Sequence, residues 1–481
     1  LMKLNKKTTI LILGCLTIIA LGLRIYNLGR SNFIEDENLM VKAAAYLYFP
    51  HEKIAPVRSF SSRLWALLLD NETVPNLFTQ VYQWDFVKEA PSQIHHSRAW
   101  PQLYLMSLTY RIFGINEWSS RLISVIAGSL LIPAGYYLAR SLKRPKTLSL
   151  VYAAGLALAF PLIDFSRNAR MYSLFGLLFL LAINPRIWKK PVLGLLSLIL
   201  AYWLHLLTLL IPTAVAVEAL IKKRSKRLVW LISGLILLFA ISRLERVDIF
   251  HHYFWQLKIK PDWQYFMMLL AFPWPWWLNA AIIISRFRSI FTDRNLSWLM
   301  ILVLTYLVFL IFLGKMPAGG AYVYPLVPII LLFVVDCLKN QRWLLIILMI
   351  AIFARFLLGF NYLYQGRNGQ AKIPQAYQII INQFKPGEQV LGIQIRDYYL
   401  QDLAPETPIT NLPEKQSLEL TEFIKLKNQV AGGFMVWEVE KIAHLKPEVV
   451  SYIKNNFKHL AGENIDNNLV EIYYWPKRGI F

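Results

Sequence analysis

Apolar runs of membrane-spanning length recur along most of this sequence. Of its 481 residues, 56% are hydrophobic, and the mean hydropathy is +0.42. A soluble domain arranges its apolar residues in periodic faces that polar positions interrupt. An unbroken apolar stretch of about 20 residues instead matches the ~30 Å hydrocarbon core of a bilayer. The sequence therefore predicts a polytopic α-helical membrane protein.

Positive charge alternates with these runs. Lys and Arg outnumber Asp and Glu by 51 to 29, which gives a net charge of +22. In a soluble protein this excess would suggest nucleic acid, but in a membrane protein Lys and Arg gather in the cytoplasmic loops. Lys3, Lys6 and Lys7 precede the first run, which lacks a small-residue cleavage site. We interpret this run as a retained signal anchor with a cytoplasmic N-terminus.

Run lengths and basic loops together predict about eleven spans. They are Thr8–Leu28, Glu117–Leu142, Leu148–Asp164, Met171–Ile187, Val192–Trp203, Leu206–Ile221, Leu228–Ile241, a span ending at Arg286, Leu296–Leu313, Ala321–Cys337 and Trp343–Tyr362.

Two regions do not read as ordinary spans. Residues 29–98 form an external loop with helical pieces near Asp36–Tyr48 and Arg63–Leu69, which we expect to lie along the membrane surface. The stretch Ala99–Phe113, at about 15 residues, is short for a crossing, and we expect it to be interfacial or re-entrant. Residues 1–364 are thus predicted to form the membrane domain.

Residues 365–481 contain no membrane-length run and show an α/β pattern. We expect helices near Ile373–Phe384 and Pro447–Phe457. Strands are expected at Gln389–Ile395, Gly433–Trp437 and Leu469–Trp475. An odd number of spans would place this small α/β domain outside the cytoplasm.

Three consecutive acids, Glu35, Asp36 and Glu37, follow the first span. They could simply favour the first turn of a helix, where carboxylates interact well with the helix dipole. Alternatively, a carboxylate at the membrane face could act as a general base or ligate a divalent cation.

Several cations and aromatic residues are expected on the same external side. Arg167 and Arg170 join two spans there, against the positive-inside bias, and Tyr172 follows them. They could contact lipid headgroups, or they could grip a phosphate leaving group. Arg98 and Lys315 are further candidate phosphate contacts. The external histidines His95, His96, His205, His251 and His252 are candidates for cavity or loop positions, and all but His205 are candidate ligands of a divalent metal.

The ordered set of motifs resembles the GT-C glycosyltransferases of the protein O-mannosyltransferase and aminoarabinose transferase superfamily. The matching pieces are Asp36-Glu37, Pro101–Tyr104, Phe113–Arg121, Ser166–Leu174 and Tyr322–Pro328. The resemblance implies a GT-C fold, a polyprenyl-phosphate-linked sugar donor and an active site at the outer face. It also implies that Asp36 is the catalytic base and Glu37 the second acid. Tyr322 and Tyr324 fall in the last motif and are expected to line the substrate cavity.

The expected function is an inverting sugar transfer to a protein, lipid or cell-envelope glycan, in the plasma (inner) membrane and without nucleic acid. Two rival classes are a transporter or flippase of lipid-linked sugars and a non-catalytic membrane scaffold. A transporter would typically show repeated halves, and this sequence shows none.

Overall fold

A computed structural model gives the arrangement of the chain. The structure describes residues 5–29, 35–48, 99–221, 276–293, 296–313 and 322–365. From 373 to 476 it describes all residues except 394, 397–398, 401–402, 404–406, 413–417, 430–431, 439–444 and 462–469.

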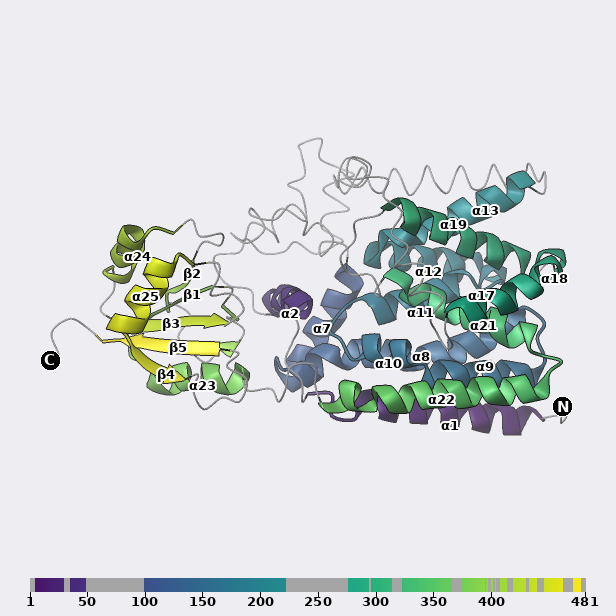
Figure 1. Cartoon of the computed structure of the whole chain (residues 1–481), viewed down its shortest axis with the longest axis horizontal. Helices are drawn as coiled ribbons and strands as arrows, with labels where there is room; N and C mark the ends of the chain where they lie inside the picture. Colours follow the sequence, from purple (N-terminus) through teal and green to yellow (C-terminus); the bar gives the residue numbers. More distant parts are fainter. Residues whose placement is uncertain are drawn as a thin grey trace. The chain divides into compact units, whose positions relative to one another are not determined.

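Most of the described residues up to 365 are helical (Figure 1). The helices are α1 (Lys6–Ile25), α2 (Glu35–Tyr48), α7 (Trp100–Phe113), α8 (Glu117–Ser141), α9 (Lys146–Leu158), α10 (Phe160–Ser166), α11 (Tyr172–Ala182), α12 (Pro191–Leu204), α13 (Leu210–Ile221), α17 (Trp276–Ser285), α18 (Phe287–Thr292), α19 (Ser297–Leu313), α21 (Val327–Cys337) and α22 (Arg342–Gln365). Short 3-10 turns occur at η2 (Ile187–Lys189), η3 (Leu206–Leu209) and η4 (Tyr324–Leu326).

Among the residues that the structure describes, three helices are long and apolar enough to cross a membrane: α1, α8 and α22. A fourth span results if the bent pair α9 and α10 is counted as one, with a bend of 53°. Shorter apolar helices cover most of the other predicted spans within the described residues, while Leu228–Ile241 lies outside them.

A proline explains the bend between α9 and α10. Pro161 has no N–H, so the carbonyl of Ala157, four residues earlier, cannot receive its helical hydrogen bond. The guanidinium of Arg24 on α1 approaches this carbonyl instead, with Nη1 3.4 Å from the oxygen. The Arg24 side chain is fully buried. A cation from the neighbouring helix therefore accompanies the break in the span.

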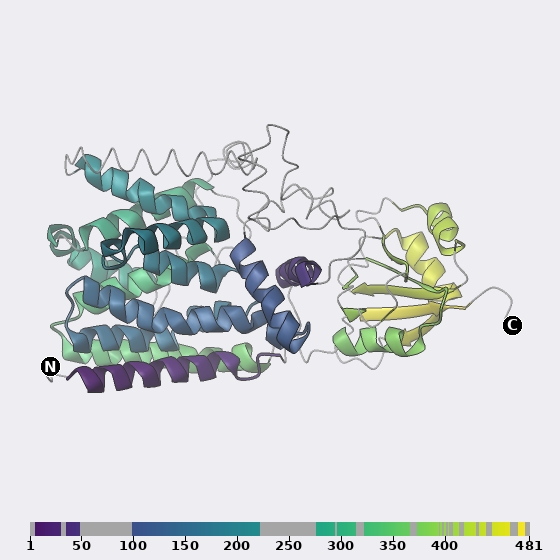
Figure 2. The ribbon, with the colours of Figure 1, turned by 180° about the vertical axis from the view of Figure 1, so that it is seen from behind.

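The outward faces of the long helices are apolar. Leu358 on α22 is 82% exposed, and Ile18 on α1 is 70% exposed. Contiguous apolar surface of this kind is unfavourable in water and matches lipid chains. Helices α1, α8 and α22 also have roughly parallel or antiparallel axes (Figure 2). These features are those of a helical membrane protein.

Helix α7 crosses the end of the helical bundle at a steep angle to α8 (Figures 1 and 2). At 14 residues it is about 21 Å long, which is shorter than a bilayer core. Its end is marked by Gly114, whose φ of +69° lies in the left-handed region that favours glycine after a helix. The side chain of Asn116 donates to the carbonyl of Phe113, and α8 begins at Glu117.

A five-stranded sheet forms the centre of the C-terminal region. Its strands are β1 (Gln389–Gly392), β2 (Ile409–Asn411), β3 (Gly433–Glu438), β4 (Lys458–Ala461) and β5 (Val470–Trp475), in the order β2-β1-β3-β5-β4. β2, β1 and β3 are parallel, whereas β5 runs antiparallel to both β3 and β4. The helices of this region are α23 (Ile373–Gln383), α24 (Leu420–Lys427) and α25 (Pro447–Asn456).

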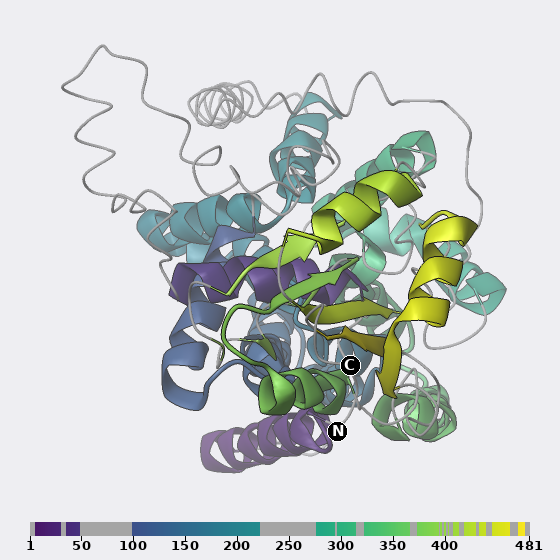
Figure 3. The same cartoon turned by 90° about the vertical axis from the view of Figure 1, so that its left-hand side faces the viewer.

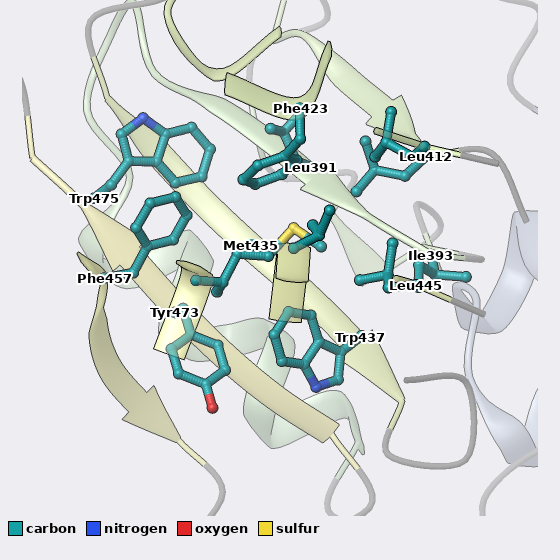
Figure 4. Close-up of a cluster of buried hydrophobic side chains, with 13 residues drawn as sticks. Leu391, Ile393, Leu412, Phe423, Met435, Trp437, Leu445, Phe457, Tyr473 and Trp475 are labelled. Atoms are coloured by element: carbon teal, nitrogen blue, oxygen red, sulfur yellow. The ribbon is translucent and has the colours of Figure 1, made fainter. Parts of the chain in front are cut away.

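Alternating side chains of the strands build one core on each face of the sheet. Val390 and Phe434 pack with Tyr377 of α23, while the next residues along the strands, Leu391 and Met435, face the other way. Figure 3 shows α23 on one side of the sheet and α24 with α25 on the other. The second core is rich in aromatic residues (Figure 4), among them Phe423, Trp437, Phe457, Tyr473 and Trp475.

The chain divides into two compact units. The helical unit comprises residues Leu1–Tyr26, Tyr46–Ile112 and Ser119–Phe360. The second unit comprises Asn27–Ala45, Phe113–Trp118 and Asn361–Phe481. The first part of α2 and the first two residues of α8 thus belong with the C-terminal domain, although they are remote from it in sequence.

Candidate functional site

Two arginines are buried in the turn between α10 and α11. The turn comprises residues 167–171, all of which are buried, and it includes Arg167 and Arg170. Burying a guanidinium is costly unless hydrogen bonds or an anion compensate. The two guanidinium groups have different hydrogen-bond partners.

Arg167 binds the end of helix α1. Its Nη1 donates to the carbonyl oxygens of Arg24 at 2.9 Å and Tyr26 at 2.6 Å. The last carbonyls of a helix have no partner within the helix, and a cation there also interacts well with the negative end of the dipole. The described contacts of Arg167 therefore give it a structural role that the sequence did not predict.

Arg170 is held beside the start of α11. Its Nη2 donates to the hydroxyl oxygen of Tyr172 at 3.2 Å, and its guanidinium carbon lies 5.4 Å from the centre of the Tyr172 ring. Only Met171 separates Arg170 from the first residue of α11, where the backbone N–H groups make a positive helix end. A buried cation next to a helix N-terminus creates a positive environment suited to a phosphate.

The ring of Tyr172 lies against two further rings, those of His205 and Tyr322. We call these three residues the aromatic cluster. The ring centres lie 6.3 Å apart for Tyr172 and His205, 6.4 Å for Tyr172 and Tyr322, and 5.2 Å for His205 and Tyr322. All three side chains are buried. Residues from α11, from the end of α12 and from the segment before η4 thus meet, and a substrate cavity at this place stays a prediction.

His205 lies at the break between α12 and η3. It ends α12 in an extended conformation, and its Nδ1 accepts the backbone N–H of Leu207 at 3.2 Å, which caps η3. The proton of the neutral imidazole is therefore assigned to Nε2. The ring also stacks on Phe175, with ring centres 5.1 Å apart.

Tyr324 packs against Gly176, a glycine of α11. Its hydroxyl donates to Oγ of Ser173 at 3.2 Å. A Cβ atom on Gly176 would lie only 2.4 Å from Cε1 of Tyr324, so glycine is needed for this close approach. The hydroxyl of Tyr306 donates to the carbonyl of Tyr322 at 2.6 Å and fixes the neighbouring backbone.

The three acids are the first three residues of α2, in the second unit. Glu37 is fully buried, which for a carboxylate requires compensating contacts. For Asp36 the structure describes the backbone, which lies in the first turn of the helix. Carboxylates in this turn interact favourably with the positive helix end.

The whole chain is similar in structure to a solved membrane protein. No protein-family model and no curated protein matches its sequence. The crystal structure of ArnT from Cupriavidus metallidurans bound to undecaprenyl phosphate has a TM-score of 0.62 and 12% identity, with 98% of each chain covered. The apo form of that protein has a TM-score of 0.60 and 13% identity, with 97% of each chain covered.

The chain has the fold of this ArnT. The similarity extends over the C-terminal region as well as the membrane helices, because nearly the whole of both chains is covered. At this level of identity it establishes the fold alone, and the side chains of this chain define the site.

Sequence reasoning missed two residues that support Arg170 within this ArnT fold. Ser124 on α8 donates through Oγ to the backbone carbonyl of Arg170 at 2.9 Å. Gln102 on α7 donates in turn to Oγ of Ser124 at 3.2 Å, and both side chains are buried. Ser120 and Ser124 lie four residues apart on one face of α8, and this pair of small polar residues was the signal that could have revealed the contact.

Several predicted site residues lie outside the described residues: His95, His96, Arg98, His251, His252 and Lys315. Among the described residues, no group of three or more His, Cys, Asp or Glu side chains is placed to hold a metal ion. The histidines proposed as metal ligands therefore stay a prediction.

Proposed function

We propose that this protein is a membrane glycosyltransferase that moves a sugar from a polyprenyl-phosphate donor to an acceptor. The acceptor is a protein, a lipid or a cell-envelope glycan, and transfer inverts the anomeric configuration. The N-terminus is cytoplasmic, and the C-terminal domain lies outside the plasma (inner) membrane. The ArnT fold, seen in a protein crystallised with undecaprenyl phosphate, supports this class of donor.

The reaction as proposed forms one bond and breaks one. The acceptor oxygen or nitrogen attacks the anomeric carbon of the sugar, and its proton passes to the carboxylate of Asp36. The bond between the anomeric carbon and the phosphate oxygen breaks as the new bond forms. Polyprenyl phosphate leaves with one more negative charge than it carried in the donor.

The proposal rests on one observation, the buried position of Arg170 beside the start of α11. A leaving phosphate gains charge in the transition state, so a cation aimed at it accelerates the reaction more than it strengthens ground-state binding. Arg170 is buried, lies beside the positive end of α11 and is held by Tyr172 and Ser124. A cation fixed in this way needs no reorganisation when charge develops.

The aromatic cluster supplies the environment for the sugar and phosphate. Tyr172, His205 and Tyr322 present ring faces and polar tips within a buried region, as do many sugar-binding sites. Glu37 acts as the helper of Asp36. The phosphate contacts assigned to Arg98 and Lys315 remain part of this proposal.

The proposal is tested by incubating the purified full chain in lipid nanodiscs with defined polyprenyl-phosphate sugars. Mass spectrometry should detect free polyprenyl phosphate together with a sugar-modified acceptor. Asp36→Asn should insert into membranes normally and abolish transfer, because an amide cannot take the proton. Full transfer by this variant would refute the assigned base.

The same experiment separates the rival classes. A flippase would move the intact donor across a sealed vesicle without releasing polyprenyl phosphate. A scaffold would do neither, and Asp36→Asn would then change nothing. Release of polyprenyl phosphate that depends on Asp36 supports only the transferase.

A further inference from the structure

One hydrogen bond joins the C-terminal domain to the start of α8. The hydroxyl of Tyr399 donates to Oε1 of Glu117, the first residue of that helix. Glu117 is only 6% exposed, and a buried carboxylate requires such a partner. Both residues belong to the second unit, although 282 positions separate them in the sequence.

The loop that carries Tyr399 is anchored within its own domain. The backbone N–H of Arg396 donates to the hydroxyl of Tyr377 on α23 at 2.9 Å, and the N–H of Tyr399 donates to the carbonyl of Arg396 at 2.9 Å. The rings of Tyr377 and Tyr399 are 5.5 Å apart. These contacts anchor Tyr399 to α23 of its own domain.

This loop follows the carboxyl end of β1, a place where α/β domains commonly bind their ligands. The chain leaves the carboxyl end of β1 to form β2 on one side and later forms β3 on the other. Ligands of open α/β sheets bind outside the carboxyl ends of the strands at such a switch point. Here the loop from that edge binds Glu117 of the same polypeptide.

The first turns of α8 connect Glu117 to Arg170. Glu117 and Ser124 are seven residues apart, so they lie on the same face of the helix, about 10 Å apart along its axis. Ser124 holds the carbonyl of Arg170. Thr109 and Tyr110 of α7 bind Ser119 and Ser120 in the intervening turn, each at 2.9 Å. This segment is thus hydrogen-bonded at both ends and in the middle.

We propose that Tyr399 and Glu117 are positioning residues through which the C-terminal domain holds Arg170 in place for catalysis. The inference rests on the proposed transferase function, in which Arg170 stabilises the leaving phosphate. The domain acts on the reaction by fixing the start of α8. Because Ser124 of this helix is hydrogen-bonded to the backbone carbonyl of Arg170, the position of α8 determines the position of Arg170.

The test compares Tyr399→Phe with Tyr474→Phe in the full chain. Tyr474 also donates to a glutamate, Glu388 at 2.8 Å, but that bond lies inside the C-terminal domain. Tyr399→Phe should lower kcat roughly 10- to 100-fold, because a small misplacement of a catalytic group is costly, while KM for the donor changes little. Tyr474→Phe should keep wild-type kcat.

Glu117 provides a second, independent variant. Glu117→Ala should lower kcat as Tyr399→Phe does, and the double variant should be no slower than the slower single one, since both remove one interaction. Glu117→Gln keeps an acceptor for the Tyr399 hydroxyl and should restore part of the rate. Additive effects, or a normal rate in Tyr399→Phe, would overturn the proposal.

Hydrogen–deuterium exchange separates this inference from the proposed function. Backbone amides of residues 117–124 and 167–172 should exchange faster in Tyr399→Phe and at the wild-type rate in Tyr474→Phe. Unchanged exchange in Tyr399→Phe overturns the coupling, whatever the enzyme does. If the wild-type protein shows no sugar transfer and these amides still exchange faster in Tyr399→Phe than in wild type, the coupling is supported and the transferase function is refuted.

Discussion

Nε of Arg144 lies 2.9 Å from Oδ1 of Asp336, and both side chains are buried. Nη2 of the same arginine lies 2.7 Å from Asp293, so one guanidinium joins the residue after α18 to the end of α21. Lys339 adds a weaker contact to Asp336 at 3.4 Å. The loop after α8 is thereby fixed to two other parts of the helical unit.

Removing Arg144 should destabilise the helical unit strongly. Arg144→Ala leaves two acids with little compensation, and breaking a buried ion pair in this way costs about 3–5 kcal/mol. Chemical denaturation in detergent micelles should show this loss. Lys143→Gln, at the exposed neighbouring position, is the control and should change stability little. Equal stability of the two variants would refute the account.

Substituting Arg170 should affect catalysis more than folding. Arg170→Ala should lower kcat by roughly 10²- to 10³-fold, the usual loss when one transition-state hydrogen-bond donor is removed. Arg170→Lys keeps the charge but loses the planar fork and should recover only part of the rate. Titrations of the donor at saturating acceptor measure kcat and the KM for the donor. An Arg170→Ala enzyme with near-normal kcat would contradict the assigned role.

Arg167 should behave in the opposite way. Its guanidinium bonds the carbonyls of Arg24 and Tyr26, so Arg167→Ala leaves the end of α1 unsatisfied. Hydrogen bonds to a charged group contribute about 1.5–3 kcal/mol, and stability in detergent should fall by an amount of that order. The folded fraction should turn over at a rate close to wild type, and a large loss of kcat without loss of stability would instead indicate phosphate binding.

Gly176→Ala should disturb the site through Tyr324. The added Cβ would lie 2.4 Å from the Tyr324 ring, and overpacking of this kind costs about 1–3 kcal/mol. Displacement of the ring should also lower the transfer rate. Gly14→Ala on α1, where a Cβ meets nothing within 4 Å, is the matched control and should stabilise by up to about 1 kcal/mol, because alanine favours a helix interior. A Gly176→Ala protein as stable as Gly14→Ala would show that the ring has room to move.

Burial and the nearby carboxylate of Glu388 raise the pKa of Tyr474 to about 12. Because the folded pKa exceeds the ordinary value of about 10, the associated stability is complete below pH 10 and declines as pH rises toward 12. The difference between the ultraviolet pH titration curves of wild type and Tyr474→Phe should show this ionisation at high pH. In Glu388→Gln the same transition should move to lower pH, and an unshifted transition would exclude the carboxylate as a cause.

Local elements were largely predictable from local pattern. The expected strands at Gln389–Ile395, Gly433–Trp437 and Leu469–Trp475 correspond to β1, β3 and β5, and the helix at Pro447–Phe457 corresponds to α25. Short-range periodicity and turn residues decide such segments. Strand β2, with only three residues, carries too little pattern to be recognised.

The arrangement of the arginines could not be predicted in this way. Arg167 and Arg170 are three residues apart and both were candidate phosphate contacts, yet one binds the end of α1 and the other binds Tyr172. Which carbonyl or hydroxyl a guanidinium meets depends on neighbours that come from distant parts of the chain. The same is true of Ser124 and Gln102, whose partners only the packed helices define.

By itself, the sequence determined that the chain is helical and apolar enough for a membrane, and where an α/β region follows, because hydropathy and periodicity are properties of short segments. The tertiary structure decided which residues share a site and which unit holds the start of α2 and of α8. It also linked Tyr399 to Glu117 across most of the chain. Contacts between distant segments depend on how the helices and the sheet pack, and no local pattern encodes that packing.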